Sequence, residues 1–437
     1  MSKSVARMLA LALLVGTAAA QGEDLRDVYR LAQESDPQLR AAEAGHRAAL
    51  EARPQSRAAL LPNVSFTAQK QWNQVDIKKP VSTDKDYDTA SYSLNLRQAV
   101  YHHDYYVQLR QADAGIAAAD AQYGSARQAL VVRVAEAYFN LLSAEDNLRF
   151  AEAEKTAIAQ QLRQTQQRFE VGLSAITDVH EAQAGYDAAV AQEIVAQNQL
   201  ENTREILREI TGREHTVLAP LADEIPLQRP DPASIDKWVE TALQQNLQLL
   251  AVEAATHVAR EEMNRRQAGH YPTLDIVASH TWSDTTESGT VSANENNSNV
   301  IGLQFNVPLF AGGAVSASTR EATHLYTQAQ EALEQIRRAT VRQTRDAYLG
   351  VTAGTSTVLA RRQALSSAQT ALEATQAGFD VGTRTAVEVL NSQRELFRVQ
   401  RDYARARYDY ALSTLRLKQA AGILTEADLD HLNSWLQ

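Results

Sequence analysis

The 437-residue chain contains no cysteine at all. This absence excludes a disulfide framework, a thiolate metal site, a cysteine nucleophile and a lipid-modified N-terminal cysteine. Only three methionines are present, so the chain also lacks the soft ligands expected of a protein dedicated to copper or silver export. After the first 20 residues, no segment approaches the ~18 to 20 consecutive apolar residues that a membrane-spanning helix needs.

Acidic residues outnumber basic ones: 53 aspartates and glutamates stand against 43 lysines and arginines, which gives a net charge of −10. Binding to nucleic acid requires basic patches that neutralise phosphates, so nucleic acid is not an expected partner. The sequence also shows no nucleophile–base pair, metal-ligand cluster or phosphate-binding loop. His102 and His103 are adjacent, but the tyrosines around them favour an aromatic girdle at a membrane interface over a metal site. We therefore expect neither an enzyme nor a cofactor.

The N-terminus has the layout of an export signal. Lys3 and Arg7 precede the apolar run Met8–Val15, and three alanines follow at 18–20. A basic region, a short apolar region and small residues in this order predict a secretory signal peptide at residues 1–20. The alternative is a buried N-terminal helix, which the small residues and the polar sequence after them disfavour. The mature chain is expected to start near Gln21.

The chain contains an internal duplication. The stretch RFEVGLSAITDV at 168–179 returns as GFDVGTRTAVEV at 378–389, 210 positions later. Identical residues elsewhere show the same offset of 210 positions: Pro62 and Pro272, Tyr138 and Tyr348, Gln183 and Gln393, Gly212 and Gly422. Only between Tyr101, which matches Phe310, and Tyr138 does the offset differ by one residue. We expect the following divisions: a first structural repeat at 21–217, a proline-rich linker at 218–232, a second repeat at 233–424 and a C-terminal segment at 425–437.

Each copy contains two segments of alternating polarity. After Pro62, the apolar residues Val64 and Phe66 alternate with polar ones, and a polar loop such as Thr285–Ser298 separates each pair of segments. Period two over ~10 residues predicts strands with one apolar face. The strands fit either a half-buried hairpin packed on a helix or a hairpin of a lipid-facing barrel. Four strands cannot close a barrel, and lipid does not tolerate open edges, so a barrel requires several chains.

Two very long helices are predicted. The stretches 104–170 and 313–380 contain no proline, and each would form one helix of ~65 residues, ~100 Å long at 1.5 Å per residue. Shorter helices follow at 177–210 and 385–421. Apolar residues recur every seven positions, which indicates packed coiled-coil helices: Val351, Val358, Leu365, Leu372 and Phe379. A soluble coiled-coil scaffold is the alternative, but it has no use for a signal peptide or lipid-compatible hairpins.

Four features together resemble the outer-membrane efflux protein family. They are VPLFAGGAVSAS at 307–318, the two turns quoted above, ARYDYALSTLRLKQAAGIL at 406–424, and the duplication. The resemblance covers about residues 23–433. It implies a mainly α fold with β: long coiled-coil helical hairpins plus four strands, with three chains forming a twelve-stranded outer-membrane barrel and a twelve-helix periplasmic tunnel. The segment 425–437 would lie at the equator of that tunnel.

The resemblance also implies a function. The homotrimer would be a passive exit duct in the outer membrane, for tripartite multidrug efflux pumps, type I protein secretion or both. Its partners would be a periplasmic adaptor (membrane fusion) protein, an inner-membrane pump or ABC transporter, and outer-membrane lipid. A self-sufficient porin is disfavoured because it closes its barrel within one chain. An exported coiled-coil scaffold or adhesin without transport remains the alternative.

The site residues follow from the same resemblance. Arg384 is expected to bond to Thr177 and Asp178 in the closed state. Phe379 stands where a member of that family has a tyrosine, so a hydrogen bond from a hydroxyl at this position is absent here. Asn391 removes a carboxylate from the narrowest point. The expected adaptor-docking tips are Val171, Gly172, Leu173, Val381, Gly382 and Thr383. The expected periplasmic gate comprises Thr177, Asp178, Glu181, Phe379, Arg384, Glu388 and Asn391.

The residues by themselves allow plainer interpretations of the same turns. Thr385 and Glu388 have the spacing of a helix capping box, and Asp178 lies in a first helical turn, where the helix dipole favours an acid. Gly172 and Gly382 suit the left-handed residue after a helix end. Arg384 differs, because a cation near a helix N-terminus opposes the dipole and requires another partner.

Overall fold

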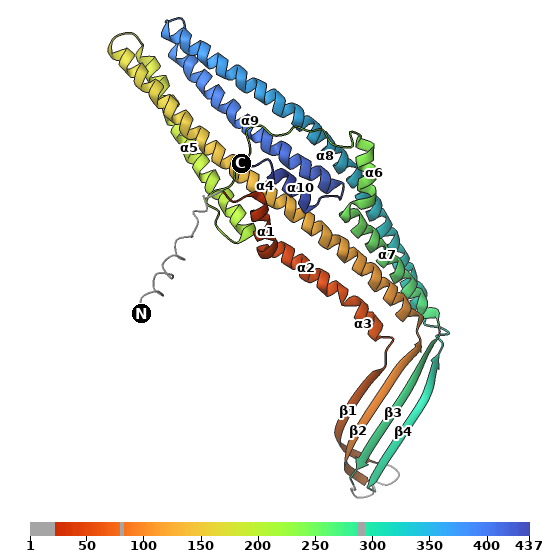
Figure 1. Ribbon diagram of the computed structural model, residues 1–437. Coiled ribbons are helices and arrows are strands. Elements are labelled where there is room, and N and C mark those ends of the chain that lie inside the picture. The colour runs from red at the N-terminus through yellow and green to blue at the C-terminus, as the bar shows by residue number, and fades with distance from the viewer. Residues whose placement is uncertain (1–21, 79–82, 287–292) are drawn as a thin grey trace, which may run out of the picture. The chain divides into compact units, whose positions relative to one another are not determined.

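The computed structural model describes residues 22–78, 83–286 and 293–437. The signal peptide expected at 1–20 lies outside these residues. The described chain is mainly helical with four strands, and it divides into two compact units (Figure 1). The first unit holds the described residues up to 41 together with 124–246 and 339–437. The second unit holds the described residues of 42–123 and 247–338.

The order of elements occurs twice along the chain. The first series is α1 (Leu25–Ser35), α2 (Pro37–Leu50), α3 (Ala52–Ala58), β1 (Asn63–Ile77), β2 (Thr83–Tyr101), α4 (His103–Glu170) and α5 (Ile176–Thr211). The second is α6 (Ile235–Gln245), α7 (Leu247–Gln267), the 3₁₀ turn η1 (Ala268–His270), β3 (Thr273–Thr285), β4 (Asn294–Asn306), α8 (Ala314–Asp380) and α9 (Ala386–Ala420). A short α10 (Glu426–Asn433) follows. Helices α4 and α8 have 68 and 67 residues, which confirms the two long helices.

The second unit contains one antiparallel sheet in the order β1-β2-β3-β4. The central β2–β3 pair joins the two copies, and Tyr92 lies opposite Trp282 with their rings stacked at 5.3 Å. Apolar side chains on the alternating positions are exposed, with Phe66 at 67% and Leu303 at 73%. They are therefore not packed on a helix of the same chain, as a half-buried hairpin would require. Strands β1 and β4 form the two edges.

Strand β4 begins earlier than the alternation indicated. The polar loop expected at Thr285–Ser298 is shorter, because Thr285 ends β3 and Asn294 already begins β4. Backbone hydrogen bonds extend the ladder beyond the apolar residues, since strand pairing does not depend on side-chain polarity. No described helix is both long enough and apolar enough to cross a membrane.

The core of the first unit is aromatic. Tyr138 and Phe139 on α4 and Tyr410 on α9 are almost fully buried in one apolar cluster. The Tyr410 hydroxyl accepts a hydrogen bond from the Gln228 N–H at 2.8 Å, and so holds the non-helical segment between the copies against α9. Leu221 in the same segment forms a backbone bridge with Leu436.

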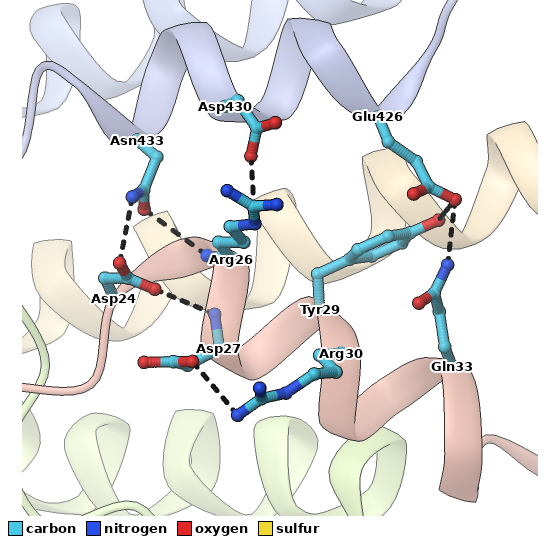
Figure 2. A network of polar contacts seen from close by, with 9 residues as sticks. All are labelled: Asp24, Arg26, Asp27, Tyr29, Arg30, Gln33, Glu426, Asp430 and Asn433. Atoms are coloured by element: carbon cyan, nitrogen blue, oxygen red, sulfur yellow. Dashed lines mark hydrogen bonds and ion pairs between the residues drawn. The ribbon is translucent and has the colours of Figure 1, made fainter.

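Figure 2 shows how the first and last helices of the first unit are held together. Asn433 Nδ2 donates to Asp24 at 2.9 Å, and Arg26 forms an ion pair with Asp430 at 3.3 Å. Glu426 accepts hydrogen bonds from three side chains: Gln33 at 2.9 Å, Arg127 at 3.1 Å and Tyr29 at 3.4 Å. Burial, reinforced by the Glu426 carboxylate, raises the pKa of Tyr29 to about 12. Helices α1 and α10 are thus tied by several polar contacts.

Candidate functional site

The two Phe-acid-Val-Gly turns lie in the first unit and have the same backbone geometry. Gly172 has φ 78° and Gly382 has φ 80°, a left-handed conformation that glycine adopts without a steric cost. The N–H of Leu173 donates to the Arg168 carbonyl at 2.7 Å, and the N–H of Thr383 donates to the Gly378 carbonyl at 2.8 Å. These bonds close the ends of α4 and α8 as Schellman motifs. The helix-capping interpretation of both glycines is confirmed.

Apolar side chains project from both turns. Val171 is 69% exposed, Leu173 75% and Val381 76%. Grouped exposed apolar residues on a protein surface mark a place where another surface binds. The expected docking-tip residues therefore lie where a partner could contact them, on two turns of matching shape.

The Asp178 carboxylate accepts hydrogen bonds from residues of its own turn. Its Oδ2 accepts hydrogen bonds from the Ser174 hydroxyl at 2.7 Å and from the Ala175 N–H at 3.2 Å. Ala175 has no side-chain oxygen, so only half of a capping box is formed at the start of α5. Thr177 and Glu181 are exposed. Within the described chain, no hydrogen bond joins Asp178 or Thr177 to α8 or α9.

Arg384 is paired locally. Its Nη1 donates to Glu388 Oε1 at 2.6 Å, one helical turn away. The other oxygen of Glu388 accepts from the Thr385 N–H at 2.7 Å, and the Thr385 hydroxyl accepts from the Glu388 N–H at 3.3 Å. The capping box is thus confirmed. The Thr385 N–H, and after it Arg384, lower the pKa of the Glu388 carboxyl.

The bond expected between Arg384 and the Thr177–Asp178 pair is not formed within this single chain, and it stays a prediction for the assembled protein. Glu388 in the first turn of α9 is within reach of Arg384 just before that helix, whereas the Asp178 carboxylate is already bonded to its own turn. Gly378 makes room for the arginine, because a Cβ at this position would lie 2.7 Å from Arg384 Cγ. Asn391 is exposed on α9.

Among the described residues, Phe379 is the one expected gate residue that contacts the other hairpin. Its side chain is 7% exposed and packs with Ala386, Val389 and Leu372. The Arg168 guanidinium lies over its ring, 4.2 Å from the centroid. Sequence reasoning missed Arg168. The only signal was the comparison of the copies, in which arginine at 168 corresponds to glycine at 378.

Other titratable clusters do not form a metal site in the described part of the chain. No group of three or more histidine or acidic side chains there is arranged to hold a metal ion. His102 is buried at the start of α4 and is hydrogen-bonded to Asp275 at 3.1 Å, which also binds Arg97. This arrangement is a satisfied polar cluster at a strand-to-helix junction, stacked on Tyr105.

The chain is similar in sequence to a known protein family and to several of its members. The sequence profile described as "Outer membrane efflux protein" matches residues 28–213 and 238–423, two spans offset by 210 residues. The chain is 40% identical to the outer membrane protein TolC of Vibrio cholerae, over all of this chain and 99% of that protein. It is 33% identical to the alkaline protease secretion protein AprF of Pseudomonas aeruginosa, over 93% of this chain and 86% of that protein.

Among solved structures, the CmeC outer membrane channel of Campylobacter jejuni has a similar fold. The TM-score is 0.79 at 16% identity, with 95% of this chain and 90% of that chain covered. The fold of this chain is thus similar to that of an outer membrane channel. The repeated profile match and the full-length relatives show that this chain belongs to the outer membrane efflux protein family.

Proposed function

We propose that this chain is a subunit of a passive exit duct in the outer membrane. One observation carries the proposal: in each copy, two strands of an open four-stranded sheet with exposed apolar side chains are followed along the chain by a helix of 68 or 67 residues. Apolar residues on the outward face of strands suit lipid, and helices of this length suit a tunnel across a wide compartment. The similarity to AprF, an alkaline protease secretion protein, supports secreted polypeptides as one class of cargo.

The duct is assembled from three copies. The edge strands β1 and β4 have no further partner among the described strands, and lipid requires each edge to be paired. Three chains give a closed barrel of twelve strands and a tunnel of twelve helices. Residues 1–20 serve as the signal peptide, 21–217 and 233–424 form the two repeats around the linker 218–232, and 425–437 lies at the equator.

The turns form the periplasmic end of the duct. Val171–Leu173 and Val381–Thr383 dock a periplasmic adaptor, which recruits an inner-membrane pump or ABC transporter. Because Arg384 is 57% exposed on its side chain, it can exchange Glu388 for Thr177 and Asp178 of a neighbouring copy. Glu181, Phe379 and Asn391 complete the gate. The exposed apolar tips and the weak local ion pair support this arrangement.

Single-channel conductance in planar bilayers tests the gate. Arg384→Ser removes a charged hydrogen bond worth about 1.5 to 3 kcal/mol per chain, so we expect a larger open conductance than in the unchanged protein. Arg398→Ser is the matched control, because Arg398 lies on α9, further from the turn, and pairs with Glu395 and Asp402 instead. Equal conductance of all three proteins would show that Arg384 does not hold the tip closed.

Deletion of the protein tests the duct itself. We expect cells without it to become sensitive to several unrelated toxic compounds, to lose secreted polypeptides, or both. An exported scaffold or adhesin would leave both properties unchanged. Fractionation with heat-dependent gel mobility provides the second measure, because an oligomeric barrel enters the outer membrane and changes mobility on heating.

A further inference from the structure

Arg168 has an aromatic ring as its partner. Its guanidinium lies 4.2 Å from the centroid of Phe379, well within the ~6 Å range of a cation–π contact. No described residue forms an ion pair or a hydrogen bond with this guanidinium. Arg384, only a few residues from the ring, is instead paired with Glu388. The Arg168 charge is therefore directed to the ring face and not to a carboxylate.

The ring is held in a fixed position. Phe379 is 7% exposed and lies in a small apolar cluster with Ala386 and Val389 at the start of α9 and Leu372 on α8. A ring that is packed on one side and covered by a cation on the other is partly desolvated, which strengthens the attraction. Because Arg168 lies in the last turn of α4, the contact joins the two helical hairpins at their turns.

Comparison of the two copies shows that this contact is asymmetric, because its reciprocal pair is absent. The residue equivalent to Phe379 is Phe169, which is 41% exposed. The residue equivalent to Arg168 is Gly378, where any Cβ would meet the Arg384 side chain. The first hairpin thus supplies only the cation, and the second hairpin supplies only the buried ring. Two turns with matching backbones differ at the positions that form this pair.

We propose that Arg168 and Phe379 form a latch that holds the two hairpin turns of one chain together, so that separating the turns breaks this contact. Arg168 is then a positioning residue for the periplasmic end, a role not expected from the sequence. The latch itself follows from the contacts within one chain. Its consequence for opening the duct rests on the proposed function.

The absence of cysteine allows a direct test. Val171→Cys and Val381→Cys place spin labels on two exposed tips of one full-length chain. The labelled chain is assembled with an excess of unlabelled chain, so that an oligomer rarely contains two labelled chains. Pulsed electron paramagnetic resonance in detergent then measures the distance between the two labels of one chain. Arg168→Gln removes the cation, Phe379→Leu removes the ring face, and Phe379→Tyr keeps it. Phe169→Leu is the matched control in the other copy.

We expect Arg168→Gln and Phe379→Leu to raise the population of separated turns by about two- to thirtyfold, the factor that corresponds to one cation–π contact. Phe379→Tyr and Phe169→Leu should keep the original distance distribution. The double variant should resemble either single variant, because both remove the same contact. Arg168 is only half-buried, so its variant tests the latch even where a change at Phe379 impairs folding.

Unchanged distances in Arg168→Gln would overturn the latch, whatever Phe379→Leu does, because the ring would then act through packing alone. Conductance of the same variants reports separately on the duct. A distance change without a change in conductance supports the latch and contradicts the proposed gate. A change in both supports the latch and links it to opening.

Discussion

The hydroxyl of Tyr138 lies 2.8 Å from the Ala219 carbonyl and 3.1 Å from the Glu23 carbonyl, and it donates to these main-chain oxygens from inside the core. Burial raises the pKa of this phenol far above its usual value. The equivalent Tyr348 in the second copy is half-buried and makes no hydrogen bond through its hydroxyl to a described residue. One residue type therefore has different contacts in the two copies, because the Tyr138 hydroxyl reaches carbonyls of both the N-terminal segment and the linker.

Tyr138→Phe should lower the free energy of unfolding by about 1 to 3 kcal/mol, because two buried carbonyl groups lose their donor. Tyr348→Phe should change it by less than about 0.5 kcal/mol, as expected for a position without such a contact. Urea denaturation of the purified protein in detergent, followed by tryptophan fluorescence, gives the midpoints for comparison. Equal midpoints for the two variants would mean that the Tyr138 hydrogen bonds contribute nothing to stability.

At the scale of elements, the proline-free stretches predicted α4 and α8, and the turns predicted the starts of α5 and α9 to within one residue. Patterns of this kind are local, and local sequence determines them. The partner of Arg384 was not predictable in the same way, because a local pattern does not determine which acidic side chain a long flexible arginine contacts. Arg168 was missed because a cation over a ring has no characteristic spacing in the sequence.

Helices α5 and α9 approach closely at Gly185. A Cβ there would lie 3.0 Å from both Leu390 Cδ2 and Arg394 Nη2. Leu390 belongs to a small buried cluster with Ile158 and Ala189, so it has little room to move. The absence of a side chain at this one position allows the two hairpins to pack.

Gly185→Val should therefore destabilise the protein by about 1 to 3 kcal/mol through overpacking. Gly350→Val is the control on α8, where a Cβ has nothing within 4 Å, and there valine should be neutral or slightly stabilising because it replaces a poor helix former. Thermal midpoints in the same detergent provide the comparison. A Gly185→Val protein as stable as the Gly350→Val protein would show that α5 and α9 can move apart without cost.

At the scale of the whole molecule, one chain leaves apolar side chains uncovered on its helices as well as on its sheet. Ile194 and Val195 on α5 are 64% and 61% exposed, and Leu349 and Leu359 on α8 are 57% and 53% exposed. Side chains of this kind scattered singly are ordinary, but together with the exposed apolar side chains of the sheet and its two edge strands they indicate contact with further copies. The sequence predicted this need for assembly, whereas the number of copies depends on angles between chains that no local pattern determines.

Val195→Glu places a charge beside Ile194 on the exposed apolar surface of α5, where a neighbouring copy would have to bury it. Because an unpaired buried charge is strongly unfavourable, we expect loss of the heat-modifiable oligomer on gels and a shift to single chains in native mass spectrometry. Gln197→Glu adds the same charge to an exposed polar position two residues away, and it should leave the oligomer intact. If Val195→Glu assembles as well as Gln197→Glu, the α5 surface at Ile194 and Val195 does not contact a second copy. The exposed α8 surface around Leu349 is then the next candidate for that contact.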